Sequence, residues 1–129
     1  MTKQIMVVDD DAAMLTLISL MLERAGYTVF TADSGIEALE TLQYTTPDLI
    51  LLDIMMPGMD GIELCKRIRT QSKTSRTPVL FLSAQGDMRV IKRGILAGAT
   101  GYLSKPVTRR ALISQIESTL GLSEMAAAM

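Results

Sequence analysis

Five polar residues stand directly after, or at the end of, short apolar runs, and their types could carry chemistry: Asp9, Asp10, Asp53, Ser83 and Lys105. Three converging carboxylates would form a hard oxygen site that suits Mg²⁺, which binds carboxylates, waters and a phosphoryl oxygen. Without a cation, close carboxylates repel and raise one another's pKa. An aspartate beside such a cation can attack phosphorus, while an ammonium and a hydroxyl stabilise the transferred group. These residue types therefore predict magnesium-assisted phosphoryl chemistry.

The chain lacks the residues that other reaction types require. Its 129 residues include no histidine and a single cysteine, Cys65, which excludes Ser-His and Cys-His catalysis, histidine-based zinc sites and an internal disulfide. The sequence contains neither the P-loop pattern G-x-x-x-x-G-K-[ST] nor the dinucleotide pattern G-x-G-x-x-G. A haloacid-dehalogenase-type phosphatase would carry Asp-x-Asp, but Met55 stands two positions after Asp53. We expect Cys65 to be inert packing.

Length and composition indicate one globular domain. Hydrophobic residues make up 48% of the chain and charged residues 21%, with a formal net charge of −1, so no overall basic field favours direct contact with nucleic acid or membrane. The apolar start is too short for a signal peptide, and no apolar run approaches a membrane span. We expect a cytoplasmic protein with a domain over residues 1–121 and a tail or linker start at 122–129.

Short apolar runs predict five strands, and helical periodicity predicts a helix after each one. We expect strands at residues 5–8, 28–32, 49–52, 79–82 and 102–104. We expect helices from Met14 to Gly26, after the capping residue Ser34, after the loop 55–58, around Ile91 and Ile95 with the flanking glycines 94 and 98, and from the capping residue Thr108 to Gly121. Glu37 completes a predicted capping box with Ser34.

The same periodicity predicts which helical residues face the core. The inward stripe of the first helix is expected to contain Leu17, Ile18, Met21 and Leu22, with Leu15 off this stripe. In the fourth helix, Ile91 and Ile95 are expected to point inward, and the opposite stripe is expected to contain Met88, Lys92 and Leu96.

Strands that alternate five times with helices predict a doubly wound α/β fold, in which a parallel sheet is covered on both faces. In such a sheet, ligands bind at the carboxyl ends of the strands. The five polar residues named first all stand at those ends, so we expect them to meet although they are far apart in the sequence.

The chain also contains four longer motifs in order: Val7–Asp11, Leu51–Gly61, Leu82–Ala84 and Gly98–Pro106. Together they resemble the receiver domain of response regulators in two-component signalling, and the resemblance covers about residues 3–120. It implies a (βα)5 fold with the flavodoxin-like strand order 2-1-3-4-5. It also implies a phosphorylation-controlled switch rather than an enzyme that acts on external substrates.

The resemblance implies how the acidic residues act. Asp53 would be the phosphoacceptor. The Mg²⁺ ion would bind Asp9, Asp10 and Asp53, and the backbone carbonyl of Met55 would supply a further ligand. The alternatives are purely structural. Asp10 or Asp11 would only cap the first helix, and Asp53 would be an ordinary acidic residue at the end of a strand. We expect Asp11 to be the cap.

The resemblance also implies how the phosphoryl group would be sensed. Ser83 and Lys105 would contact it, and Tyr102 would be the switch residue that turns inward when Ser83 moves toward the phosphate. A cis peptide bond would precede Pro106. Without the resemblance, Lys105 could be a solvated loop residue, and Tyr102 could be a residue at the edge of the hydrophobic core.

The resemblance implies partners as well. A histidine kinase or histidine phosphotransfer protein would donate the phosphoryl group, and we expect Leu15 to pack on that donor. An unknown output partner would bind the surface of the fourth helix, fifth strand and fifth helix, where Met88 and Leu96 are expected contacts. Thr100-Gly101 replaces the acidic residues that winged-helix regulators use for dimers, so we expect a monomer or weak dimer. The alternative function is a protein-interaction module of the same fold whose phosphorylation site is not used.

Overall fold

The computed structural model describes residues 2–84 and 88–121 and contains a five-stranded parallel sheet with five helices. The strands are β1 (Gln4–Val8), β2 (Thr28–Ala32), β3 (Leu49–Asp53), β4 (Val79–Ala84) and β5 (Gly101–Lys105). The helices are α1 (Ala12–Arg24), α2 (Gly35–Thr41), α3 (Gly61–Thr70), α4 (Met88–Leu96) and α5 (Arg109–Leu120). The predicted tail at 122–129 lies outside the described residues.

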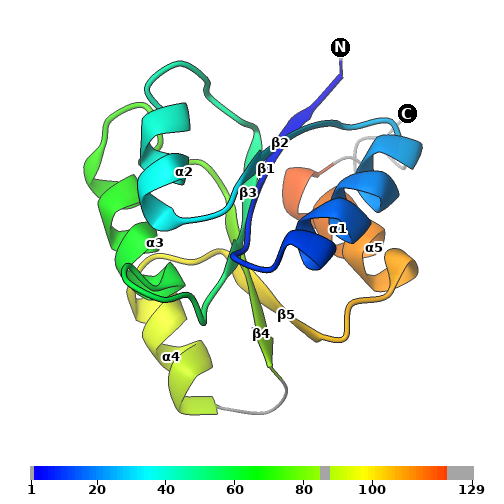
Figure 1. The fold of residues 1–129 in the computed structure, drawn as a ribbon. Helices are drawn as coiled ribbons and strands as arrows, with labels where there is room; N and C mark the ends of the chain where they lie inside the picture. Colours follow the sequence, from blue (N-terminus) through cyan, green and yellow to red (C-terminus); the bar gives the residue numbers. More distant parts are fainter. Residues whose placement is uncertain (1, 85–87, 122–129) are drawn as a thin grey trace.

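The strand order is β2-β1-β3-β4-β5, and every neighbouring pair is parallel. Helices α1 and α5 cover one face of the sheet, while α2, α3 and α4 cover the other (Figure 1). Both the doubly wound architecture and the order 2-1-3-4-5 are therefore confirmed. Among the described residues, no helix is long and apolar enough to cross a membrane.

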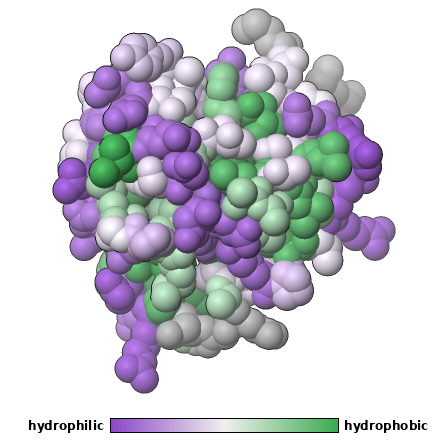
Figure 2. Space-filling view, viewed as in Figure 1, coloured by the Kyte–Doolittle hydropathy of each residue, from purple (hydrophilic) through white to green (hydrophobic). Residues whose placement is uncertain are grey.

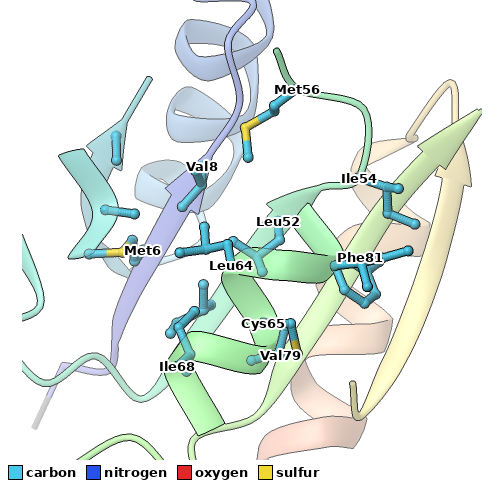
Figure 3. Packing of buried hydrophobic residues seen from close by; sticks show 14 of the residues in the cluster. Met6, Val8, Leu52, Ile54, Met56, Leu64, Cys65, Ile68, Val79 and Phe81 are labelled. Atoms are coloured by element: carbon cyan, nitrogen blue, oxygen red, sulfur yellow. The ribbon is translucent and has the colours of Figure 1, made fainter. Parts of the chain in front are cut away.

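The alternation of side chains along the central strands produces two cores, one on each face. Ile5 and Val7 belong to the core under α1 and α5, whereas Met6 and Val8 belong to the core under α2, α3 and α4. Figure 3 shows the second of these cores, with Leu52 from β3 among the side chains of its neighbours. Both faces are buried, which explains why the central strands are continuous apolar runs.

Side-chain caps begin four of the helices. The Asp11 carboxylate accepts from the backbone N–H of Ala13 at 2.9 Å, as predicted, and Ser34 and Thr108 cap their helices as predicted. The capping box at Ser34 is only partly correct, because the Glu37 carboxylate accepts from Asp33 rather than from Ser34. The Asp60 cap of α3 was not predicted.

Two predictions about α1 are wrong. Leu17 was expected on the inward stripe, but 45% of its surface is exposed. Leu15 was expected off that stripe, but it is partly buried against the core. The fully buried positions are Ile18 and Leu22, so the helix is rolled to place Leu15 rather than Leu17 beside the sheet.

The predicted face of α4 is also wrong at one position, because Ile95 is 55% exposed. The buried residues of this helix are Ile91 and Gly94. A Cβ atom built on Gly94 would lie 2.7 Å from Cε2 of Phe81, so the aromatic ring packs directly on the helix backbone. This close approach turns the helix and leaves Ile95 at the surface, together with Met88 and Leu96, whose exposure was correctly predicted.

Cys65 lies in the core, as predicted. Its side chain is fully buried, and its thiol donates a weak hydrogen bond to the backbone oxygen of Ala97 at 3.6 Å. Burial raises the pKa of this thiol, although the charge of Arg69 acts in the opposite direction. The cysteine is therefore held in its unreactive form.

Candidate functional site

The carboxyl ends of β1 and β3 bring three carboxylates together. These strands are neighbours with Val8 opposite Leu52, so Asp9, which follows β1, and Asp53, which ends β3, lie at the same edge of the sheet. Carboxylate oxygens of Asp9, Asp10 and Asp53 all lie within 4.8 Å of one another. The sequence prediction that these acids converge is thus confirmed by the geometry.

The three carboxylates differ in burial. Asp9 is completely buried and Asp53 is 4% exposed, whereas Asp10 is exposed. The buried Asp9 accepts a hydrogen bond from the backbone N–H of Asp11 at 3.0 Å, which holds its side chain toward the start of α1. Two buried acids beside one exposed acid form a site that is open to solvent on one side.

Lys105 is the cation that contacts this cluster. It is the last residue of β5, and its Nζ atom lies 3.1 Å from Oδ1 of Asp53 and 3.3 Å from Oδ2 of Asp9. The peptide bond between Lys105 and Pro106 is cis, as predicted. Burial lowers the pKa of Lys105, but the hydrogen bond and charge of Asp53, with the charge of Asp9, outweigh this effect and raise it.

The site still carries an excess of negative charge. Burial raises the pKa of Asp53, and the charges of Asp9 and Asp10 add to this effect, whereas the hydrogen bond and charge of Lys105 oppose it. Three carboxylates face one ammonium, so a divalent cation would bring the group of charges to neutrality. An all-oxygen donor set with an exposed side fits Mg²⁺, which keeps some of its waters.

Ser83 and Tyr102 occupy neighbouring strands, Ser83 near the carboxyl end of β4 and Tyr102 near the start of β5. Ser83 is 5% exposed, and its hydroxyl donates to the backbone oxygen of Ala84 at 3.3 Å. Tyr102 lies opposite Phe81 in the β4–β5 pairing and is 41% exposed. The aromatic ring is thus at the surface of the molecule in this structure.

The remaining predicted residues are exposed or partly exposed. Met55 follows β3 in the loop that also contains Met56, and its side chain is 70% exposed. Met88 and Leu96 are 69% and 80% exposed at the two ends of α4. Leu15 is only partly exposed, because it packs against the core on one side.

The sequence did not reveal the contribution of Gly61 to the site. Its backbone N–H donates to the oxygen of Ile54 at 2.9 Å, and a Cβ atom at this position would lie 2.9 Å from Cα of Ile54 and overlap the backbone oxygen of Asp53. Only glycine lets α3 begin this close to the end of β3. The capping signal of Asp60, followed three residues later by Glu63, could have indicated this helix start.

Comparison with known proteins agrees with this geometry. The family model described as "response regulator receiver domain" matches residues 5–117. The chain belongs to this family. Receiver domains of response regulators are signalling domains of two-component systems, and a phosphorylation switch is their general function.

Proteins named as transcriptional regulators are among the similar proteins. The chain is 42% identical over 127 residues to the alkaline phosphatase synthesis transcriptional regulatory protein PhoP of Bacillus subtilis. This alignment covers 98% of the chain and 52% of PhoP, so the chain spans about half the length of that relative.

Solved receiver structures share the fold closely. A putative response regulator from Chloroflexus aurantiacus has a TM-score of 0.90 and 38% identity, covering 94% of this chain and 99% of the other. The receiver domain of a sensor histidine kinase from Pseudomonas aeruginosa has a TM-score of 0.86 and 30% identity over 94% and 99% of the two chains. That structure holds a magnesium ion coordinated in its active site cleft.

Proposed function

We propose that this receiver domain accepts a phosphoryl group on Asp53 in a reaction that requires Mg²⁺. The observation that carries the proposal is the convergence of Asp9, Asp10 and Asp53 within 4.8 Å, with Lys105 bonded to two of them. The raised pKa of Asp53 supports it, because burial and then the charges of Asp9 and Asp10 disfavour the ionised carboxylate, and a bound cation would offset both. The magnesium ion in the Pseudomonas aeruginosa receiver domain supports the choice of metal.

The donor would be the phosphohistidine of a histidine kinase or histidine phosphotransfer protein in the cytoplasm, since this chain has no histidine. A carboxylate oxygen of Asp53 attacks phosphorus, the phosphorus–nitrogen bond breaks, and its electron pair stays on the imidazole. Bound Mg²⁺ would neutralise charge on the phosphoryl oxygens. Asp9, Asp10 and the backbone carbonyl of Met55 would hold the ion.

Lys105 and Ser83 would then hold the phosphoryl group. Lys105 already contacts Asp53, so its ammonium needs to move little to pair with a phosphoryl oxygen on that side chain. The Ser83 hydroxyl bonds only weakly to Ala84 and is free to exchange this bond for one to phosphate. Tyr102 would turn inward as Ser83 moves and so change the surface of α4, β5 and α5.

Leu15 is the residue that we propose contacts the phosphoryl donor. It lies in the first turn of α1, just after the acids of the site, and is partly exposed. Because its other side packs on the core, a polar replacement could also disturb the fold. We expect Leu15→Asp to slow phosphorylation by the protein donor while acetyl phosphate still labels Asp53 at the wild-type rate.

The function can be tested by mass spectrometry of the intact protein after incubation with acetyl phosphate. We expect one added phosphoryl group with Mg²⁺, none with EDTA and none in Asp53→Asn. If the group is added equally without Mg²⁺ or in the variant, the proposed chemistry is wrong. No labelling under any condition, with a protein donor included, would favour the alternative of an interaction module that does not use its site.

A further inference from the structure

The sheet ends on one side at β2, and the outer edge of this strand is open. The N–H of Thr28 and the oxygen of Ala32 point inward, with hydrogen bonds of 3.0 and 3.2 Å to backbone groups that flank β1. Backbone groups point to alternate sides along a strand, so the N–H and C=O groups of Val29 and Thr31 point away from β1. These groups form a row of donors and acceptors with which another strand can pair.

A groove of about 470 Å³ lies between α1 and β2, and we call it the α1–β2 groove. Its lining includes Thr31 of β2 and Ser19, Leu20 and Glu23 of α1. Leu20 is 45% exposed, and Figure 2 shows hydrophobic side chains at the surface on the right of the molecule, where α1 lies. A strand added to β2 at the usual spacing of about 4.8 Å would direct every second side chain to this groove.

One polar group that lines the groove has no partner. Across the described ranges 2–84 and 88–121, the Oγ atom of Ser19 is the buried side-chain polar atom that forms no hydrogen bond. Buried hydroxyl groups normally have a partner, because an unpaired one costs free energy. Glu23 lies one helical turn after Ser19 on α1 and also lines the groove. The hydroxyl and the carboxylate together can accept hydrogen bonds from an ammonium group.

Acidic residues dominate this side of the molecule. From the start of α1 to the end of α2, the chain contains four acidic residues and one basic residue. The acids are Glu23, Asp33, Glu37 and Glu40, the base is Arg24, and all five are exposed. An occupant of the β2 edge is therefore favoured when it carries positive charge.

We infer that the β2 edge and the α1–β2 groove bind an extended basic segment of a partner protein as an added strand. The backbone of this segment pairs with Val29 and Thr31. A lysine of the segment lays its aliphatic stem on Leu20 and places its ammonium between Ser19 and Glu23. None of these residues belongs to the acidic site, so the inference goes beyond the proposed function.

Other occupants leave part of this surface unsatisfied. A second copy that paired its own β2 with this edge through a twofold axis would bring two acidic edges together. Nucleic acid would be repelled by the same carboxylates. A helix in the groove would leave the outward backbone groups of Val29 and Thr31 without partners.

The probe is a fluorescently labelled peptide of alternating lysine and valine, titrated with the whole protein while anisotropy is measured. The control peptide has glutamate in place of each lysine. Thr31→Pro removes an outward N–H that β1 does not use, and Thr31→Val, which keeps this N–H, is its matched control. Glu23→Lys and Ser19→Ala test the groove, and Glu63→Lys, at an exposed glutamate of α3, is the matched control for charge.

We expect the lysine peptide to bind and the glutamate peptide not to bind. Thr31→Pro and Glu23→Lys should each raise the dissociation constant about fivefold, with little change in Thr31→Val and Glu63→Lys. Ser19→Ala should weaken binding without lowering the free energy of unfolding, because its hydroxyl has no partner to lose in the free protein.

Equal binding of both peptides, absence of binding, or equal loss in the matched controls would overturn the inference. Stronger binding to duplex DNA, or self-association that Thr31→Pro abolishes, would overturn it as well. Urea unfolding of each variant separates loss of pairing from loss of the fold. If Thr31→Pro does not fold, unchanged binding in Glu23→Lys and Ser19→Ala still rejects the inference.

Labelling of Asp53 by acetyl phosphate in the same variants separates this inference from the proposed function. Leu15, the proposed contact of the phosphoryl donor, also lines the groove, so a small-molecule donor is used. All the variants should be labelled at the wild-type rate. Normal labelling without peptide binding would reject the added strand and keep the switch chemistry. Peptide binding without labelling would reject the switch chemistry and keep the added strand.

Discussion

The Nζ atom of Lys105 lies 3.1 Å from Oδ1 of Asp53, although 52 residues separate them in the chain. The same ammonium also contacts Asp9, so one cation is shared between two buried carboxylates. This arrangement only partly compensates their charge, because the pKa of Asp53 remains raised, first by burial and then by its acidic neighbours. The carboxylates of the site therefore carry negative charge that the other residues of the folded chain do not fully neutralise.

The first prediction concerns the charge of Asp53 in metal-free protein. A raised pKa means that this carboxyl favours the folded state while it is protonated, and that this stability is lost as the pH rises through the folded-state pKa. Asparagine imitates the neutral carboxyl. Asp53→Asn should therefore have a higher free energy of unfolding than wild type at pH 7 in EDTA, measured with urea.

The difference should shrink as the pH is lowered toward the ordinary range of a carboxyl group, because wild-type Asp53 then becomes neutral as well. Asp33→Asn, at an exposed aspartate, is the control and should change stability little at either pH. A lower stability of Asp53→Asn at pH 7 would contradict this account of the site.

The second prediction concerns addition and removal of the metal. If Mg²⁺ binds only the folded chain, a concentration ten times its dissociation constant should stabilise the protein by about 1.4 kcal/mol, and EDTA should reverse this. Asp10→Asn should weaken the response to Mg²⁺, because it removes one carboxylate of the cluster. Thermal unfolding over a series of Mg²⁺ concentrations measures both effects.

Asp11→Asn is the matched control, since asparagine also caps helices well and Asp11 caps α1 instead of joining the cluster. Its response to Mg²⁺ should equal that of wild type. If Asp11→Asn and Asp10→Asn lose the response equally, the ion does not bind where we place it.

The third prediction concerns Arg69, whose guanidinium joins two loops, one between α3 and β4 and one between α4 and β5. Its Nε donates to the backbone oxygen of Gly98 at 3.0 Å, and one terminal nitrogen donates to the oxygens of Thr74 and Thr77 at 3.0 and 2.6 Å. Arg69→Met would remove the donor from the oxygens of Gly98 and Thr77, while the Thr74 oxygen would keep the backbone N–H of Thr77 at 3.2 Å, and should cost about 2–3 kcal/mol of stability in urea unfolding.

Arg67, on the same helix, provides the comparison. Its ion pair with Glu63 at 3.2 Å is exposed, so Arg67→Met should cost less than about 1 kcal/mol. Equal costs for the two variants would show that the bonds of Arg69 to the loops contribute no more than a surface pair.

The fourth prediction concerns the contact between Gly94 and Phe81. Alanine favours a helix over glycine by about 1 kcal/mol, but overpacking a core costs about 1–3 kcal/mol. Because the new Cβ would lie 2.7 Å from the Phe81 ring, Gly94→Ala should destabilise the protein. In a Phe81→Leu background the same change should be neutral or stabilising, which a double-mutant cycle in urea would measure.

If the effects of Gly94→Ala and Phe81→Leu on the free energy of unfolding are additive, the Phe81 ring does not restrict the size of the side chain at position 94. In that case the roll of α4, and with it the exposure of Ile95, would need another cause.

Local sequence patterns predicted much of the fold. Strand runs such as 49–52 and caps such as Asp11 and Thr108 depend on residues a few positions apart, so the chain shows them directly. Because parallel strands end at one edge, the same patterns also placed Asp9 and Asp53 on a common edge before any contact was known. The strand order came from resemblance to receiver domains and is confirmed.

The tertiary structure decided what depends on volumes and distances across the core. The roll of α1 and α4, which exposes Leu17 and Ile95, depends on how side chains of the sheet fill the space beneath each helix, and helical periodicity does not contain this information. The pairing of Lys105 with both Asp53 and Asp9 likewise required strands from opposite ends of the chain to be assembled. Sequence alone thus determined which residues could form the site, and packing determined which of them touch.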